Sequence, residues 1–349
     1  MITNEQKEDI AKVVIATLAL RFSSFPTDTT GNRNAPFHEA FLNAFQERLN
    51  EYRINVPTLI SLSSWMHGLN TTLGMSFFEK TAQILSNGTK RGFTNNNRLS
   101  MFEEQKIAIT SIMENLKNGT QTPSLQNEDN AICLREGRET TGVNFTLDVC
   151  WHDNAEFVGI ELKSVKPNAG EVQGEKTKLL KGKASLYKQY PTLNIKYFFG
   201  FPFDPTSETP TAFDKERFLG NLVDGTRYLD PDEILVGAEL WDYLSGTEGT
   251  MEVLLEIIKA IATPNFMNNI NFLNSEEHYR DFSSTEYEDI LRSWNLHKEI
   301  EFRTEENIEI ILTSENNSLI RTFNQEIIKT QGKYNEKRIL KLLEFINTQ

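Results

Sequence analysis

Residues 144–167, NFTLDVCWHDNAEFVGIELKSVKP, contain two acids and a lysine at a spacing that could do chemistry. Two runs rich in Val, Ile, Phe and Thr flank a polar turn at residues 152–155, which predicts a β-hairpin. Because side chains alternate across a strand, Asp148 is expected on the face opposite Phe145, Leu147, Val149 and Trp151. Glu161 and Lys163 likewise alternate with Val158, Ile160 and Leu162. Closing the hairpin therefore brings Asp148 near Glu161 and Lys163.

This trio of side chains suits the hydrolysis of a phosphodiester bond. Two neighbouring carboxylates repel each other unless a cation lies between them, and Mg²⁺ prefers oxygen ligands. Bound Mg²⁺ can polarise a phosphate oxygen and lower the pKa of an attacking water. The lysine can position that water or stabilise charge on phosphorus. The alternative is a solvated sheet face with a cross-strand Glu–Lys pair, which needs no ligand.

The hairpin resembles the active-site hairpin of the PD-(D/E)xK nuclease superfamily, and within it that of the type II restriction endonucleases. Asp148 matches the first acid, and Glu161-Leu162-Lys163 matches the E-x-K motif. Leu147 stands where the motif name has proline. The resemblance covers about residues 65 to 245. It implies an αβββαβ core, Mg²⁺ held by Asp148, Glu161 and the Leu162 carbonyl, a water-orienting Lys163, and a DNA substrate.

A second segment, residues 63–85, also resembles restriction enzymes. In those enzymes a Leu-Gly pair, here Leu73-Gly74, precedes a helix that carries a glutamate toward the metal site. The resemblance makes Glu79 a candidate third acid. Glu39, on an earlier predicted helix, is a rival for this role, and a surface glutamate paired with a lysine is the alternative for Glu79.

The order of predicted elements agrees with an α/β fold whose αβββαβ core is a mixed sheet flanked by helices. Periodicity predicts a helix at 101–117, a short strand at 131–134, the hairpin, a helix at 171–190 and a strand at 194–203. If the helix of Glu79 comes first instead, residues 91–130 are an insertion. We expect an N-terminal helical extension (1–60), the catalytic core (61–225) and a mostly helical C-terminal region (226–349) with a strand-like run at 308–314.

Candidate DNA contacts lie around the hairpin. The chain has a formal net charge of -13, but residues 163–188 hold seven lysines against two glutamates. In the helix predicted there, Lys176 and Lys183 fall inside the apolar arc and need a partner, an acid of the site or a DNA phosphate. Lys178, Lys181 and Lys188 point elsewhere and are expected to be solvated or to contact the DNA backbone. The loop residues Arg135 and Arg138 could reach guanine edges, or be solvated.

Composition excludes several other classes of protein. The chain of 349 residues has no apolar run long enough for a transmembrane helix, and its charged N-terminus is unlike a signal peptide, so we expect a cytoplasmic protein. Its two cysteines and five histidines form no zinc-type cluster. No glycine-rich phosphate loop or dinucleotide fingerprint is present.

We therefore predict a Mg²⁺-dependent type II restriction endonuclease that cuts double-stranded DNA at a short specific sequence. Cutting both strands of a symmetric site favours a homodimer, and a DNA methyltransferase gene is expected nearby. One rival is a structure-specific repair or recombination nuclease on the same core. Another is a non-catalytic DNA-binding protein in which the acids are remnants.

Overall fold

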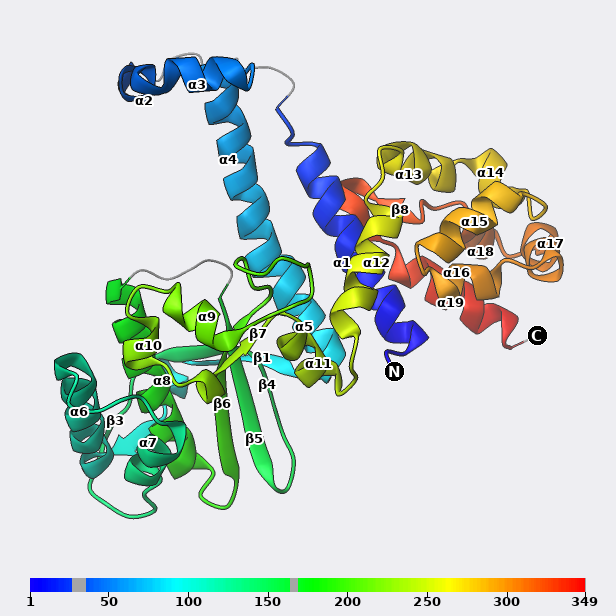
Figure 1. The fold of residues 1–349 in the computed structure, drawn as a ribbon. Coiled ribbons are helices and arrows are strands. Elements are labelled where there is room, and N and C mark those ends of the chain that lie inside the picture. Colours follow the sequence, from blue (N-terminus) through cyan, green and yellow to red (C-terminus); the bar gives the residue numbers. More distant parts are fainter. Residues whose placement is uncertain (27–35, 164–168, 349) are drawn as a thin grey trace. The chain divides into compact units, whose positions relative to one another are not determined.

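A mixed five-stranded sheet positions the hairpin in the computed structural model, which describes residues 1–26, 36–163 and 169–348 (Figure 1). The strands lie in the order β1-β4-β5-β6-β7. β1, β4 and β5 pair antiparallel, whereas β5, β6 and β7 run parallel. The strand bounds are β1 Thr89–Phe93, β4 Phe145–His152, β5 Glu156–Leu162, β6 Asn194–Phe201 and β7 Ile234–Val236.

Helices cover both faces of this sheet. On one face α8 (Ala169–Gln189) packs so closely on β6 that a Cβ added to Gly182 would lie 2.9 Å from the ring of Tyr197. On the other face, Gly200 of β6 leaves room for Leu240 of α11 (Ala238–Ser245), at 3.0 Å from its missing Cβ. α5 (Glu79–Ser86) contacts both α11 and β4. The hairpin is therefore held between α8 and the pair α5 and α11.

The αβββαβ core is present and begins at α5. β1 follows α5 directly and pairs with β4, so the core runs α5, β1, β4, β5, α8 and β6. The insertion that the sequence left as an alternative is therefore present, but it spans residues 94–144 instead of the expected 91–130. The insertion contains η4 Asn95–Asn97, β2 Ser100–Phe102, α6 Glu103–Asn118, α7 Leu125–Ile132 and β3 Glu139–Thr141. β2 and β3 form a separate two-stranded sheet.

Two predicted strands are wrong. Ala131 and Ile132 are the last residues of α7, and Cys133 and Leu134 follow that helix without forming a strand. The Ser124 side chain caps α7, and Ile132 is fully buried. The run 308–314 lies mostly in α17 (Glu305–Thr313), which Thr304 caps. Ile308 and Ile311 are buried there, three residues apart, which is the spacing of one face of a helix.

Alternation along β4 is interrupted by a β-bulge. Thr89 pairs with Cys150 and Arg91 pairs with Leu147, so Lys90 of β1 faces two residues of β4, Asp148 and Val149. As a result Cys150 joins the same buried cluster as Phe145 and Leu147, although strict alternation placed it on the other face. Both cysteines are free thiols.

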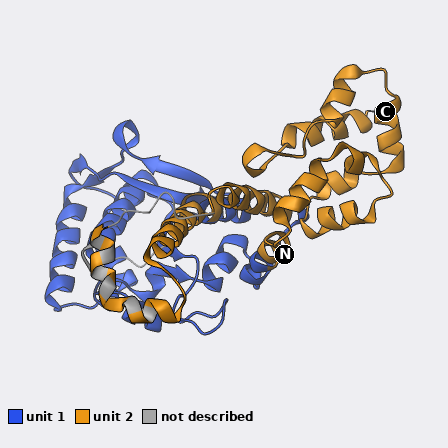
Figure 2. Cartoon of the chain, turned by 90° about the horizontal axis from the view of Figure 1, so that it is seen from above, with its two compact units in different colours: residues 1–6, 78–255 blue, residues 7–77, 256–349 orange. Residues whose placement is uncertain are grey.

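The chain divides into two compact units (Figure 2). The first comprises residues 1–6 and 78–255, and the second residues 7–77 and 256–349. These units differ from the expected segments, because the N- and C-terminal regions share one unit and β7 extends the sheet past residue 225. The remaining elements of the first unit are α9 Lys215–Gly220, α10 Gly225–Tyr228 and η5 Pro231–Glu233.

The second unit is mostly helical. Its core includes the buried ion pair of Glu299 and Arg338, at 2.9 Å. α1 and α12 each cross from one unit to the other. The elements are α1 Asn4–Phe22, α2 Pro36–Leu42, η2 Asn43–Phe45, α3 Gln46–Glu51, α4 Val56–Thr72, the π-helical η3 Leu73–Phe78, α12 Thr250–Ile261, α13 Phe266–Asn274, α14 Glu276–Arg280, α15 Thr285–Ser293, α16 His297–Phe302, α18 Asn317–Phe323, β8 Ile328–Lys329, η6 Thr330–Gly332, β9 Lys333–Tyr334 and α19 Glu336–Ile346.

Within the described ranges, none of the helices combines the length and apolar character needed to cross a membrane.

A buried group of three charges ties the insertion to the core. The Lys176 ammonium on α8 lies 2.5 Å from Glu128 of α7 and 2.5 Å from Glu233 of η5. All three side chains are almost completely buried, so Lys176 is not accessible to a DNA phosphate. The expected DNA contact of Lys176 is therefore not retained. The two acids explain how a lysine can lie on the apolar arc of α8.

Replacing Lys176 by methionine is expected to destabilise the protein by about 3–5 kcal/mol, because two buried carboxylates lose the cation that they share. The free energy of unfolding in urea measures this loss. Lys106→Met is the control, since that lysine forms an exposed pair with Glu103 on α6 and should change stability by less than about 1 kcal/mol. Equal losses in the two variants would contradict the role given to Lys176.

Candidate active site

Asp148 lies where the pairing between β4 and β5 ends. The ladder is regular from His152 and Phe157 to Val149 and Ile160. At the next step, the backbone N–H of Leu162 donates to the Asp148 side chain at 2.9 Å instead of continuing the ladder. This hydrogen bond joins the first acid directly to the E-x-K motif, whose Lys163 N–H donates to Gly200 of β6.

Glu79 reaches the same end of β4 from α5. The Gln83 amide, one turn along that helix, donates to Glu79 at 3.3 Å and to the backbone carbonyl of Asp148 at 3.0 Å. The Lys90 ammonium lies 2.7 Å from Glu79 and 3.5 Å from the Asp148 carboxylate. α5 can end close to β1 because Gly88 passes β4 without a side chain; a Cβ there would lie 2.6 Å from Val149. The structure thus brings Glu79 together with Asp148, while the Glu39 side chain lies outside the described part of the chain.

Glu161 is held from the α8 side of the sheet. Lys163 and Lys178 lie 2.7 and 2.6 Å from the same carboxylate oxygen, Oε1. The Tyr197 hydroxyl, from β6, donates to the other oxygen at 3.0 Å. Lys163 also lies 2.8 Å from Glu175 of α8. Glu161 is therefore fixed by donors from three different elements.

The two hairpin acids have opposite pKa shifts. Burial raises the pKa of Asp148; the Leu162 N–H and Lys90 oppose this shift, and the charges of Glu79 and Glu161 add to it. Burial also disfavours the charge of Glu161, but Lys163 and Lys178 outweigh burial and lower its pKa. The influence of Glu161 on Asp148 shows that the carboxylates are within electrostatic range.

Lys163 remains a cation in this environment. Burial acts to lower its pKa, but Glu161 and Glu175 outweigh burial and the pKa is raised. A protonated lysine can hold a water or an anionic oxygen as a donor, and it cannot accept a proton.

Four residues around these acids were missed by sequence reasoning: Lys90, Glu175, Lys178 and Tyr197. Lys178 was predicted to point away from the site, toward solvent or DNA. Helical spacing alone does not reveal its contact, because the angle at which α8 crosses the sheet decides which lysines reach Glu161. Tyr197 was read only as part of a buried aromatic strand.

The donor chemistry of the site fits a hard divalent cation, since its ligating atoms are carboxylate and carbonyl oxygens. Across the part of the chain that the structure describes, no three His, Cys, Asp or Glu side chains are grouped so that they could hold a metal ion together. Lysine ammonium groups lie between the acids instead. The carboxylates are thus assembled and charge-balanced, but they do not form a ready-made metal cage.

The comparisons with known proteins agree with this geometry. Residues 2–262 match the family model described as Type II restriction endonuclease, HinfI. The chain belongs to the HinfI family of type II restriction endonucleases. It is also 38% identical to the type II restriction enzyme MjaII of Methanocaldococcus jannaschii, over 97% of this chain and 96% of that protein. The region beyond residue 262 lies outside the family model but is included in the similarity to MjaII.

The family membership establishes the reaction in outline. The HinfI-family chain is a site-specific deoxyribonuclease that acts on double-stranded DNA, and enzymes of this type need a divalent metal ion. The α/β fold predicted from the sequence is confirmed as well, with the mixed sheet and flanking helices in place.

The basic segment 163–188 of this HinfI-family chain is largely neutralised by the fold. Of the six lysines in this segment that the structure describes, five form ion pairs with carboxylates, so their charges are not free for DNA. These lysines are Lys163, Lys176, Lys178, Lys183 and Lys188. Lys181 is half-buried, and Arg138 is exposed on the connection between α7 and β3.

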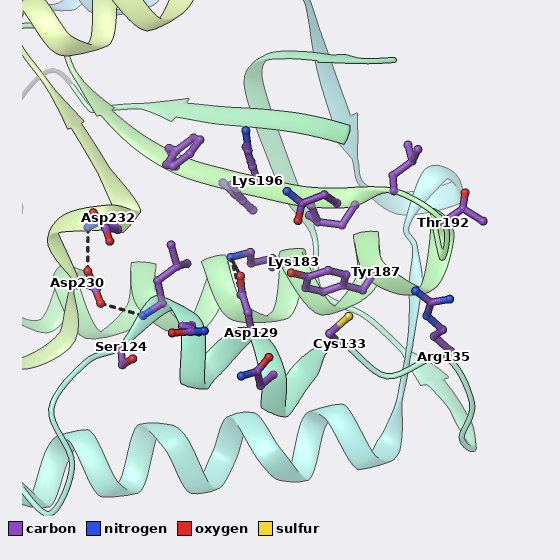
Figure 3. Close-up of a pocket in the computed structure, with 18 residues that line it drawn as sticks. Ser124, Asp129, Cys133, Arg135, Lys183, Tyr187, Thr192, Lys196, Asp230 and Asp232 are labelled. Atoms are coloured by element: carbon purple, nitrogen blue, oxygen red, sulfur yellow. Dashed lines mark hydrogen bonds and ion pairs between the residues drawn. The ribbon is translucent and has the colours of Figure 1, made fainter. Parts of the chain in front are cut away.

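Lys183 and Arg135 line a cavity of about 900 Å³ beside the first residues of β6 (Figure 3). The Lys183 ammonium points to Asp129 at 2.5 Å, and only 2% of the residue is exposed. The cavity walls include residues 194–198, whereas Glu161 pairs with Phe199, farther along β6. Lys183 therefore has an acid as its partner, as Lys176 does.

Removing the Tyr197 hydroxyl is expected to weaken catalysis without unfolding the protein. Burial and the nearby charge of Glu161 keep the pKa of Tyr197 well above its usual value, so the hydroxyl can only donate to the carboxylate. In Tyr197→Phe we expect kcat to fall about tenfold, the worth of one hydrogen bond to a charged group. The acid limb of the pH–rate profile should move to higher pH, because Glu161 loses a donor that favours its ionised form.

Tyr187→Phe is the matched control, because that tyrosine lies on α8 and interacts with Asp129, away from the site. It should leave kcat and the acid limb unchanged. If Tyr197→Phe behaves in the same way as this control, the hydroxyl does not hold Glu161 for the reaction.

Proposed function

We propose that the enzyme cuts a short specific sequence with Mg²⁺ held by Asp148, Glu161 and the Leu162 carbonyl. The hydrogen bond from the Leu162 N–H to Asp148 supports this proposal most strongly, because it brings the acid of β4 against the end of the E-x-K motif. Mg²⁺ would polarise a phosphate oxygen and lower the pKa of the attacking water. Glu79 is assigned a supporting role through a water molecule.

We assign the placement of the attacking water to Lys163. Its ammonium is fixed by Glu161 and Glu175 and lies over the Phe199 ring, 5.3 Å from the ring centre. A cation held in this way can orient a water through its lone pair and can stabilise the negative charge that develops on the phosphate oxygens. Its raised pKa argues against a role in which it removes the proton itself.

Lys163→Ala is expected to reduce cleavage at least about 100-fold while DNA binding persists, as found for the loss of one transition-state donor. The assay is a digest of unmethylated phage DNA in Mg²⁺, with fragment ends sequenced to define the site. Wild type should give discrete fragments. Lys196→Ala, which removes an exposed lysine paired with Glu156 in the same sheet, should cut normally.

Three results of this digest would overturn parts of the proposal. Wild-type rates for Lys163→Ala would remove Lys163 from the reaction. Binding of varied DNA that never becomes cutting, with any divalent ion, would favour a non-catalytic DNA-binding protein. Cleavage that follows DNA structure and gives no defined sequence would favour a repair or recombination nuclease.

The active form is proposed to be a homodimer in the cytoplasm, together with a DNA methyltransferase encoded nearby. One chain supplies one hairpin site, and a symmetric sequence presents two scissile bonds related by a two-fold axis. Sedimentation velocity of the protein on a short cognate duplex should give two chains for each duplex. A single chain per duplex that cuts both strands in one binding event would contradict the dimer.

A further inference from the structure

Lys90 occupies a position in the site that no sequence motif pointed to. At the β-bulge it is the one residue of β1 that faces both Asp148 and Val149. Its ammonium lies 2.7 Å from Glu79 Oε2 and 3.5 Å from Asp148 Oδ1. It therefore touches two of the acids assigned to the metal site, and these acids come from different elements.

The exposed fractions of the Lys90, Glu79 and Asp148 side chains show from which side the lysine reaches the acids. The Lys90 side chain is 49% exposed, against 17% for Glu79 and 21% for Asp148. The ammonium thus reaches from the solvent side onto a pair of less exposed acids. Because the β1–β4 ladder is formed by backbone atoms, the lysine side chain can leave the acids without breaking the ladder.

The electrostatic consequence follows from charge alone. Glu79 and Asp148 repel each other, and the Lys90 ammonium supplies a positive charge that both can share. A lysine ammonium is a compact charge with three donors on a flexible stem, so it can serve two carboxylates at once. A divalent ion in the same place would repel that ammonium strongly at short range.

We propose that Lys90 is a positioning residue that holds Glu79 and Asp148 together before the metal ion binds, and that the metal ion must displace its ammonium. This inference rests on the proposed function, because it takes these two acids as parts of the metal site. Lys90 then competes with the metal and keeps its ligands assembled. It lowers the affinity for the ion and stabilises the metal-free protein.

The test is calorimetric titration of Ca²⁺ into DNA-free protein, for wild type, Lys90→Met and Lys90→Gln. Both variants should bind Ca²⁺ about fivefold more tightly, the effect of removing one partly exposed competing ion pair. Lys196→Met is the control, because it removes another partly exposed lysine of the same sheet, one that pairs with Glu156. The Ca²⁺ affinity of this variant should equal that of wild type. The melting temperature of metal-free Lys90→Met should fall below that of wild type and recover at saturating Ca²⁺.

The outcomes separate this inference from the proposed function. Unchanged or weaker Ca²⁺ binding in both Lys90 variants overturns the role of Lys90, while DNA cleavage by wild type leaves the proposed function standing. No detectable Ca²⁺ binding by wild type or variants, in protein that cuts DNA, also overturns it. If wild type fails to cut DNA with any divalent ion, the proposed function itself fails.

Discussion

The site depends on keeping like charges close together at the end of the β4–β5 pairing. The carboxylates of Asp148, Glu161 and Glu79 repel one another when they approach. Burial makes the charged forms of Asp148 and Glu161 still less favourable. The protein offsets this cost with lysines placed at hydrogen-bond distance and with donors from the backbone and from Tyr197. These donors come from β1, the end of β5, α8 and β6, so these core elements must all be in place before the acids are held together.

The hairpin and the helix and strand that follow it could be predicted from the sequence, because they leave local signals. Alternating apolar residues and the polar turn identify β4 and β5, and the E-x-K spacing places Glu161 and Lys163 on one face. The helix carrying Glu79 was also found, because its Leu-Gly pair and its Asn87-Gly88 end are sequence features. Asn87 does adopt a left-handed conformation there, with φ of 52°.

The partners of the lysines could not be predicted in the same way. Lys176 and Lys183 were correctly expected on an apolar stripe, but their acid partners come from α7 and η5 and lie 48 or more residues away in sequence. The position of Lys90 depends on a β-bulge that shifts the register of β4 against β1 by one residue. No residue pattern in β1 predicts this bulge. Short apolar runs such as 308–314 fit both a strand and a helix, and a capping residue decided between them.

The insertion between β1 and β4 has a consequence for how the enzyme becomes active. Lys90 and Asp148 are adjacent in the sheet but are separated by more than fifty residues that fold into their own helices and small sheet. Pairing β1 with β4 therefore closes a long loop, which is slow compared with forming the β4–β5 hairpin. A nascent chain that has not yet produced β6 also lacks Tyr197. The active site therefore cannot be complete until synthesis of the chain has passed β6.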